Sequence, residues 1–334
     1  IADEGSESRS YQFEPLELVH SVYPDFDAHP RYEYTAAHAA AGKVVEVDLY
    51  SAATGDGAAT DDAATGNAAT GNASVRVRIG IDVGSTSTKA MAVGEDGTVL
   101  AGFYTRTSGA PLRAVQAVFE AVEDAAARQG VAFEVLGVAT TGSGRSFVGA
   151  VVGADLVLDE ISAHARAAVE IDPSTDTIIE IGGQDAKFTS LSNGVVTFSH
   201  MNTVCAAGTG SFLEEQAAKL DVSLDEYAAL AEGVPAPLAS DRCTVFMERD
   251  INNYLNRGYE PREILATALH SVRENYLQKV ASVIGDNVCF QGATAKNRAL
   301  VAAFEQKLEQ PITVSLYCHL TGAYGAALVL ADEA

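Results

Sequence analysis

Long apolar runs are missing from this sequence. No stretch among its 334 residues approaches the roughly 20 consecutive apolar residues that a membrane-spanning helix needs. The N-terminus also lacks the charged, apolar and small-residue order of a signal peptide. We therefore expect a cytoplasmic protein without a membrane partner.

Basic residues are scarce. The chain has 22 Lys and Arg against 45 Asp and Glu, which gives a formal net charge of −23. Because nucleic acids and anionic membrane surfaces are held mainly by clustered Lys and Arg, this charge argues against both as general partners. A few local basic groups are still enough to bind a nucleotide.

Cysteine is also rare, with four residues at positions 205, 243, 289 and 318. Their unrelated spacings and the absence of an export signal argue against a disulfide framework and leave reduced thiols or metal ligands. The apolar content of 47% and the mean hydropathy of +0.07 are typical of soluble globular proteins. The chain starts at Ile1 rather than Met, so we expect it to be a module cut from a longer protein.

The first 74 residues differ in character from the rest. Residues 51–74 repeat an AATG unit without any large apolar residue, which predicts a flexible low-complexity linker. Residues 1–50 carry a few aromatics and the alternating run VVEVDLY, too little for a core of their own. We expect them to form a tail, or the edge of a preceding module. The folded domain should span residues 75–334, and deletion of residues 1–74 should leave it intact.

Strand and helix signals alternate along this domain. The β-rich run at 75–84 and two strands within 88–107 precede a helix over 112–130 that ends at Gly130. A strand at 135–142, a helix at 161–171, a strand at 175–183 and a hairpin around Asn193–Gly194 follow. The longest helix is predicted over 261–285. This order predicts an α/β fold built from two similarly ordered halves.

The segment IDVGSTSTKA, residues 81–90, is the first candidate site. A buried strand delivers Asp82 to a turn whose backbone N–H groups, hydroxyls and one ammonium could hold phosphates. The residues concerned are Gly84, Ser85, Thr86, Ser87, Thr88 and Lys89. Asp82 could hold Mg²⁺ through water. For this loop taken alone, an ordinary β-turn with hydroxyl caps is an equally good interpretation.

Two further turns favour the phosphate interpretation. EIGGQDAKF, residues 180–188, is a second acidic strand that ends in a tight turn at Gly182 and Gly183, with Gln184 and Asp185 at its tip. It follows the first turn by about one hundred residues, as two facing half-domains would require. FQGATAKN, residues 290–297, is a third turn after a strand and could admit a purine close to its backbone.

Two cysteines each precede a helical pattern. Cys205 lies in NTVCAAGTGSFLEEQ and Cys243 in DRCTVFMERDINNYL. A helix N-terminus carries partial positive charge that stabilises a thiolate and the negative charge of a metal cluster. Spacing alone favours the alternative that both are buried structural cysteines. Cys289 and Cys318 lie in apolar runs and are expected in the core.

The three turns, in this order, resemble the phosphate-1, phosphate-2 and adenosine loops of the sugar kinase, actin and Hsp70 superfamily. MNTVCAAGTGSFLE and CTVFMERD resemble the cluster-binding segments of the activator family of 2-hydroxyacyl-CoA dehydratases and benzoyl-CoA reductases, the BadF/BadG/BcrA/BcrD ATPase type. The resemblance runs from about Val77 to Leu330 through DVGST, TTGSGR, IGGQDAK, CAAGTG, CTVF, GATAKN and GAYGAAL.

This resemblance implies two ribonuclease-H-like lobes with a nucleotide cleft between them. Lobe I would take in about residues 75–170 plus the C-terminal helix, and lobe II about residues 171–315. Members form homodimers that share one [4Fe–4S] cluster, hydrolyse ATP and pass one low-potential electron to a partner, after reduction by a ferredoxin- or flavodoxin-type donor. Each chain has only two suitable thiolates and a cubane needs four, so two copies of Cys205 and Cys243 would complete the cluster.

The resemblance also implies roles for the three turns. Ser85 to Lys89 would hold the outer phosphates of ATP, and Asp82 and Asp185 would orient Mg²⁺ and water. Gln184 would position the attacking water, while Gly292 and Ala293 would border the adenosine. The sequence departs from the family at two places: Ala293 stands where a second glycine is usual, and His319 where a nucleotide-contacting Gln is common.

Two other classes of function stay open at this point. A small-molecule kinase of the same superfamily, such as an N-acetylhexosamine kinase, would need a catalytic carboxylate in a substrate pocket and no paired cysteine helices. A non-catalytic nucleotide-dependent scaffold would not need intact DVGST and GGQD turns. For an activator, the electron acceptor could be a hydroxyacyl-CoA dehydratase, an aromatic-CoA reductase or a double-cubane cluster protein.

Overall fold

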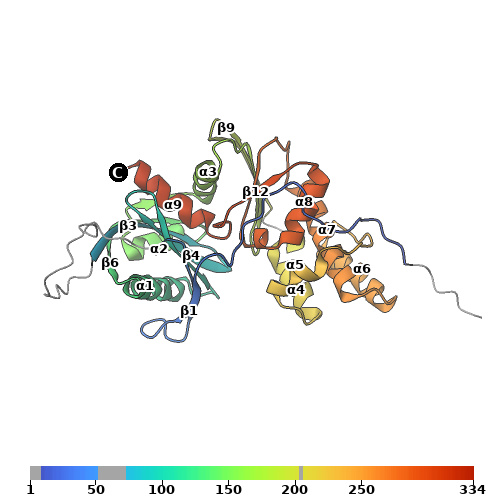
Figure 1. Ribbon diagram of the computed structural model, residues 1–334, viewed down its shortest axis with the longest axis horizontal. Helices are drawn as coiled ribbons and strands as arrows, with labels where there is room; N and C mark the ends of the chain where they lie inside the picture. The colour runs from blue at the N-terminus through green and yellow to red at the C-terminus, as the bar shows by residue number, and fades with distance from the viewer. Residues whose placement is uncertain (1–8, 52–72, 203–205) are drawn as a thin grey trace, which may run out of the picture. The chain divides into compact units, whose positions relative to one another are not determined.

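The computed structural model describes residues 9–51, 73–202 and 206–334, which divide into two compact units (Figure 1). Unit 1 contains residues up to Pro24 together with Ser174–His319, and unit 2 contains Asp25–Pro173 together with Leu320–Ala334. Each unit is built around its own β-sheet. Within the described ranges, no helix is both long enough and apolar enough to cross a membrane.

Unit 2 has a seven-stranded mixed sheet in the order β1-β2-β5-β4-β3-β6-β7. The strands β3, β4 and β5 form an antiparallel meander, and β6 pairs with β3 in parallel. The strand bounds are β1 Arg31–Thr35, β2 Val44–Leu49, β3 Ala73–Val83, β4 Ser87–Gly94, β5 Val99–Arg106, β6 Val131–Thr141 and β7 Leu156–Val157. The helices are α1 Pro111–Arg128, α2 Arg145–Val152, α3 Glu160–Ile171 and α9 Thr321–Asp332.

Alternation along β3 separates the two faces of this sheet. Ile79 and Ile81 are fully buried in the same core cluster as Ala117 and Val118 of α1. Gly80 points the other way, because successive side chains of a strand alternate between faces. A Cβ added to Gly80 would lie 1.9 Å from the carbonyl oxygen of Ala323 in α9. Helix α9 therefore packs directly on the backbone of β3, which also delivers Asp82.

Unit 1 has a five-stranded mixed sheet in the order β10-β9-β8-β11-β12. Its strands are β8 Thr177–Ile181, β9 Ala186–Ser192, β10 Val195–Asn202, β11 Val288–Gln291 and β12 Ile312–Val314. Its helical elements are η1 Ala206–Gly208, α4 Gly210–Lys219, α5 Leu224–Ala231, α6 Thr244–Asn256, α7 Pro261–Lys279, η2 Ala293–Lys296 and α8 Arg298–Leu308. The hairpin predicted at Asn193–Gly194 connects β9 and β10, with both residues at positive φ.

Helix α7 forms the centre of unit 1. It starts with Pro261 in its first turn and with a capping box between Glu260 and Glu263. It ends at Lys279, six residues before the predicted stop at Gly285. Most of its residues are buried on all sides, including polar ones such as His270 and Asn275. Buried polar side chains need hydrogen-bond partners inside the protein, and the amide nitrogen of Asn275 finds one in the carbonyl of Asp241.

Residues 25–50 differ from the tail that we expected. The strands β1 and β2 pair with each other, and β2 pairs with β5, so they extend the sheet of unit 2. Val45 and Val47 are fully buried in the core of this unit. The apolar alternation of VVEVDLY is a strand signal, but its partner β5 lies more than fifty residues downstream. Strand β3 begins at Ala73, and residues 52–72 of the predicted linker lie outside the described residues.

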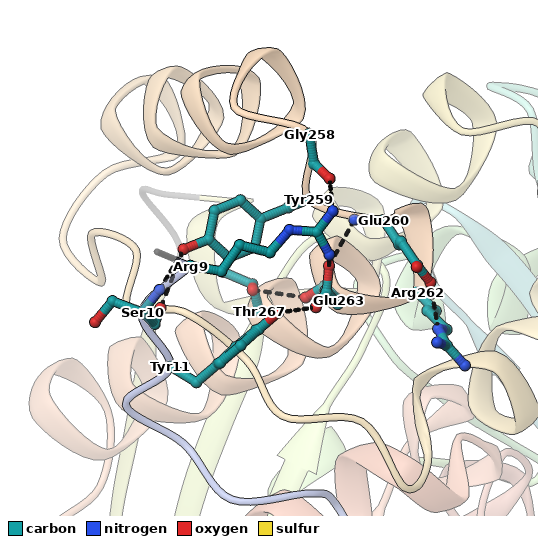
Figure 2. A network of polar contacts seen from close by, with 9 residues as sticks. All are labelled: Arg9, Ser10, Tyr11, Gly258, Tyr259, Glu260, Arg262, Glu263 and Thr267. Carbon is teal, nitrogen blue, oxygen red and sulfur yellow. Dashed lines mark hydrogen bonds and ion pairs between the residues drawn. The ribbon is translucent and has the colours of Figure 1, made fainter. Parts of the chain in front are cut away.

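Residues Arg9–Pro24, which we call the N-terminal strap, pack along unit 1. Figure 2 shows its first part, where Ser10 contacts Tyr259, and both Arg9 and Tyr11 contact the carboxylate of Glu263. Further along, the ring of Phe13 stacks on His270 with a centroid distance of 4.0 Å. Leu16 is fully buried. The strap is therefore part of the fold of unit 1.

Candidate nucleotide turns and cysteine segments

The first predicted turn connects β3 to β4 in unit 2. The backbone N–H of Gly84 donates to the carbonyl of Ser87 at 3.0 Å and closes a tight turn whose tip residue, Ser85, is exposed. Asp82 and Lys89 face each other across the two strands. The distance between Lys89 Nζ and Asp82 Oδ2 is 3.0 Å, and the Asp82 residue is only 7% exposed.

Thr107, just after β5, fixes the backbone of this turn. Its N–H donates to the carbonyl of Thr86 at 2.8 Å, and its hydroxyl donates to the carbonyl of Gly84 at 2.8 Å. The hydroxyl of Thr88 lies 2.9 Å from that of Thr107. The conformation of the turn is thus determined by the protein itself, as a preorganised phosphate-binding loop requires.

The TTGSGR segment lies against the same turn. Gly142 has a φ of +84°, and a Cβ there would lie 2.4 Å from Asp82 Oδ1. The N–H of Gly144 donates to the carbonyl of Val83 at 2.9 Å. Only glycine fits at position 142, because any side chain would displace the carboxylate.

The start of α9 encloses the other side of Asp82. A Cβ on Gly322 would lie 3.0 Å from Asp82 Oδ2 and 3.2 Å from His164 Nε2. The hydroxyl of Thr321 lies 3.1 Å from His164 Nδ1. A buried carboxylate needs compensating positive charge, and Lys89 and the N-terminal end of α9 both supply it.

The second predicted turn connects β8 to β9 in unit 1. The N–H of Gly182 donates to the carbonyl of Asp185 at 2.9 Å, and Gln184 is exposed at the tip. Asp185 Oδ2 lies 3.3 Å from Lys187 Nζ, and the Asp185 side chain is 39% exposed. Two tip side chains therefore lie within reach of solvent while the glycines hold the backbone.

The two turns share one pattern. Glu180 and Lys187 face each other across β8 and β9, with 3.0 Å between Glu180 Oε2 and Lys187 Nζ. Asp82 and Lys89 have the same seven-residue separation in the other unit. The sequences DVGSTSTK and EIGGQDAK are thus two versions of one strand–turn–strand unit. Glu180 and Lys187 are site residues that we did not predict, although the repeated spacing of an acidic residue and a lysine indicates them in the sequence.

The third predicted turn lies directly against strand β8. Gly292 has a φ of +96°, and a Cβ there would lie 2.3 Å from the carbonyl oxygen of Ile181. Thr294 donates its hydroxyl to the same carbonyl at 2.8 Å. Ala293 is exposed at the start of η2, whereas His319 is only 6% exposed. In unit 1 the predicted phosphate-2 and adenosine turns are therefore neighbours.

Helix α4 begins on the Gly182–Gly183 turn. The N–H of Gly210 donates to the carbonyl of Gly182 at 2.9 Å, and the N–H of Ser211 to that of Gly183 at 2.9 Å. The Ser211 hydroxyl also donates to the Gly183 carbonyl. N–H groups of the first helical turn have no partner inside the helix, so this turn satisfies two of them.

The four cysteines lie in different surroundings. Cys205 lies outside the described residues. Cys243 is the half-buried N-cap residue of α6, and the first turn of that helix contains no acidic side chain. Cys289 and Cys318 are fully buried. Burial raises the pKa of the Cys318 thiol to about 12, so this side chain stays protonated.

Asn275 in α7 connects the two cysteine-containing segments. Its amide nitrogen donates to the carbonyl of Asp241 at 2.5 Å, two residues before Cys243. A Cβ on Gly208, three residues after Cys205, would lie 2.7 Å from Asn275 Oδ1. Both segments therefore contact one fully buried amide side chain, another candidate residue that the sequence did not reveal. Among the described residues, no three His, Cys, Asp or Glu side chains form a group that could hold a metal ion.

A sequence model of the BadF/BadG/BcrA/BcrD ATPase family matches residues 79–329. The chain belongs to this family. The match contains all three turns and both segments that precede α4 and α6. The N-terminal strap and the strands β1 and β2 lie before it.

Similar members of the BadF/BadG/BcrA/BcrD ATPase family are dehydratase activators. The chain is 34% identical to the (R)-2-hydroxyglutaryl-CoA dehydratase activating ATPase of Acidaminococcus fermentans, over 75% of this chain and 95% of that protein. It is also 34% identical to the 2-hydroxyisocaproyl-CoA dehydratase activator of Clostridioides difficile, over 77% and 95% of the two chains.

A solved structure supports the same assignment. The activator of 2-hydroxyisocaproyl-CoA dehydratase from Clostridium difficile with bound ADPNP matches 77% of this chain and 95% of its own, with 31% identity and a TM-score of 0.68. The predicted α/β fold is confirmed, with one mixed sheet in each of the two units. The roles of the individual turn residues and of Cys205 and Cys243 stay predictions.

Proposed function

We propose that this chain is an ATP-hydrolysing iron–sulfur reductase, active as a homodimer, that transfers a low-potential electron to a 2-hydroxyacyl-CoA dehydratase or a related acceptor. The proposal is supported by membership of an ATPase family whose similar members activate such dehydratases. It is also supported by a nucleotide bound to a similar structure.

The turn residues have the chemistry to bind ATP with Mg²⁺. Lys89 presents an ammonium next to the exposed tip of its turn, where it can contact phosphate oxygens. Asp82 and Asp185 are carboxylates suited to Mg²⁺ and its water ligands. Gln184, exposed at the tip of the second turn, can orient an attacking water. Hydrolysis requires that these groups be positioned before the reaction, and Thr107 and Ser211 supply that rigidity.

The observation that carries the proposal is the attachment of α4 to the nucleotide turn. Gly210 and Ser211 hydrogen-bond to the carbonyls of Gly182 and Gly183, and Cys205 precedes this attachment by only five residues. A shift of the turn when phosphate is bound or lost must therefore move the start of α4. Chemistry at the nucleotide can in this way change the position of the cysteine segment.

We further propose that the two cysteine segments bind a cluster shared by two chains. Cys243 is the N-cap residue of α6, and the partial positive charge at that helix end suits the negative charge of a bound cluster. A [4Fe–4S] cluster bound there would supply one-electron chemistry at low potential. Each chain provides two thiols, so the second pair has to come from another copy. Val245 and Phe246, next to Cys243, are 67% and 50% exposed and offer apolar surface for that contact.

A cysteine series tests the proposal. The anaerobically purified chain should be a brown dimer with about four iron atoms per dimer. Cys205→Ser and Cys243→Ser should each lose the visible absorption and the iron. Cys289→Ser and Cys318→Ser are matched controls and should keep both, because their thiols are buried in the core of unit 1. Brown protein with full iron content in both of the first two variants would contradict the cluster assignment.

A variant of Lys89 tests ATP hydrolysis separately from cluster binding. Lys89→Ala should keep its iron and lose ATP hydrolysis by about 100-fold, the usual cost of one group that stabilises charge in the transition state. Arg76→Ala, which removes an exposed cation from the same unit, should hydrolyse ATP at the parental rate. Parental turnover in Lys89→Ala would show that this lysine does not act on the phosphates.

The similar proteins also indicate which electron acceptor to test first. The similar proteins activate dehydratases of 2-hydroxyacyl-CoA substrates, so a dehydratase of this class is the first partner to test. Reduction of the acceptor should require ATP and a ferredoxin- or flavodoxin-type donor, and should stop when Cys243 is replaced.

A further inference from the structure

The N-terminal strap reaches the adenosine turn of unit 1. The hydroxyl of Tyr23 donates to the carbonyl of Ala295, within η2, at 2.9 Å. Burial raises the pKa of Tyr23 above its ordinary value, so the phenol keeps the proton that it donates. Two more hydrogen bonds hold the same short turn. The hydroxyl of Thr294 donates to the carbonyl of Ile181, and the N–H of Gly292 donates to the carbonyl of Cys318.

Hydrogen bonds to unit 1 hold the strap just before Tyr23. Glu305, in the helix that follows η2, accepts hydrogen bonds from the N–H groups of Val19, His20 and Ser21 at 2.6, 2.9 and 2.7 Å. Burial alone would raise the pKa of Glu305, but these bonds and the one from the Ser21 hydroxyl lower it overall. The Ser21 hydroxyl also accepts from the N–H of Ile312 at 2.8 Å. The carboxylate of Glu305 therefore holds the backbone at Ser21, two residues before Tyr23, and in this way fixes the position of Tyr23.

Tyr23 lies outside the part of the chain that matches the family, which starts at residue 79. We propose that Tyr23 is a positioning residue for nucleotide binding, which holds the Ala293–Lys296 turn in the shape that contacts the adenosine. This inference rests on the proposed ATP-binding function and extends it to a segment that precedes the family match. Tyr23 acts through the backbone of Ala295 and need not touch the nucleotide.

A second tyrosine of the strap, Tyr11, provides a control for Tyr23. Tyr11 also donates its hydroxyl to unit 1, but its acceptor is Glu263 at the start of α7 (Figure 2). Tyr11→Phe and Tyr23→Phe each remove one hydroxyl from the same segment, so both should lower stability. Only Tyr23→Phe removes a contact to the adenosine turn. A purely structural role for the strap predicts equal effects of the two variants on nucleotide binding.

The test measures the dissociation constant of ADPNP by calorimetry for the full-length chain and both variants. Tyr23→Phe should raise this constant about threefold to tenfold, which is the effect of losing one neutral hydrogen bond. It should raise the KM for ATP by a similar factor with little change in kcat, and Tyr11→Phe should match the parental chain in both. Hydrogen–deuterium exchange of residues 293–297 without nucleotide should be faster in Tyr23→Phe alone.

The outcomes separate this inference from the function on which it rests. If the parental chain binds ADPNP and Tyr23→Phe binds it equally well, the positioning role is wrong and the proposed function stands. If both tyrosine variants weaken binding to the same extent, the strap only stabilises unit 1 and the positioning role is again wrong. If the parental chain does not bind ADPNP, the proposed function itself fails.

Discussion

At the scale of single residues, the two turns depend on buried pairs of opposite charge. Lys187 and Glu180 are only 3% and 6% exposed, and the Asp82–Lys89 pair is nearly as well covered. Removing one partner of such a pair leaves a buried charge and usually costs about 3 to 5 kcal/mol. These residues therefore stabilise the fold and also lie beside the predicted phosphate turns. A loss of ATP hydrolysis in variants at these positions has to be read together with a measurement of stability.

His270 predicts how the stability of unit 1 depends on pH. This residue is 1% exposed, beneath the ring of Phe13 in the strap, with Arg273 Nη1 2.9 Å from its Nδ1. Burial and the charge of Arg273 lower its pKa from 6.5 to about 3. Above pH 6.5 the imidazole is neutral in both the folded and the unfolded chain. Between pH 6.5 and pH 3 only the unfolded chain takes up the proton, so folding stability falls as the pH falls.

The size of this effect is about 1.4 kcal/mol per pH unit, or about 2 kcal/mol at pH 5. His270→Gln keeps an acceptor for Arg273 but has no proton to gain, so its free energy of unfolding should fall less between pH 7 and pH 5. Urea titrations at the two pH values measure the difference. An identical pH dependence in His270→Gln and the parental chain would exclude this role.

At the scale of elements, unit 2 is held by helices that pack without intervening side chains. A Cβ on Gly325 of α9 would lie 1.8 Å from the carbonyl oxygen of Ala163 in α3. Helix α9 therefore touches β3 through Gly80 on one side and α3 through Gly325 on the other. This close fit brings the start of α9 to Asp82. The GAYGAAL motif is thus explained by packing at Gly325 and by the close approach of Gly322 to Asp82.

Gly325→Ala should destabilise unit 2 by about 3 kcal/mol or more, because neither backbone can move away without shifting a whole helix. Since α9 also encloses Asp82, ATP hydrolysis should fall in parallel. Equilibrium unfolding in urea and the ATPase rate measure the two effects. Ala331→Ser, at an exposed position near the end of the same helix, should change the free energy of unfolding by less than about 0.5 kcal/mol. A fully stable Gly325→Ala protein would show that the two helices are not packed this closely.

At the scale of the whole molecule, the first 50 residues contribute to both units. The strap completes unit 1, and in unit 2 the strand β2 pairs with β5 and β1 forms the edge of the sheet. Tyr32 in β1 also donates to Asp124 of α1 at 2.8 Å. The sequence predicted that these residues could be deleted without consequence, and the structure leads to the opposite prediction.

A deletion series tests the contribution of these residues. Removal of residues 1–24 should destabilise unit 1, because it takes away the fully buried Leu16 and the anchor at Glu305. Loss of a buried leucine alone costs about 2 to 5 kcal/mol. Removal of residues 1–50 should destabilise unit 2 as well, through the loss of Val45 and Val47. The full-length chain serves as the reference. Urea unfolding of the three proteins measures the effect, and equal stability of all three would restore the interpretation as a tail.

Local patterns in the sequence were enough to predict the individual turns and most of the helices and strands. The glycine turns at Gly84, Gly182 and Gly292 could be read from it because their conformations depend on neighbouring residues: a strand, a glycine and short polar side chains. The α/β class and the family followed from their order along the chain. Helix α7 was found for the same reason, although its end was placed too late.

Which distant residues share a site depends on long-range packing and could not be predicted from local patterns. Nothing in the sequence places Asn275 between the two cysteine segments, or Gly322 beside Asp82 and His164. These contacts join residues that are tens to more than two hundred positions apart. The same holds for β1 and β2, whose apolar residues are too few for a core and become buried only against β5 and α1. A short segment is stabilised by the residues that pack against it, and the complete fold determines which residues those are.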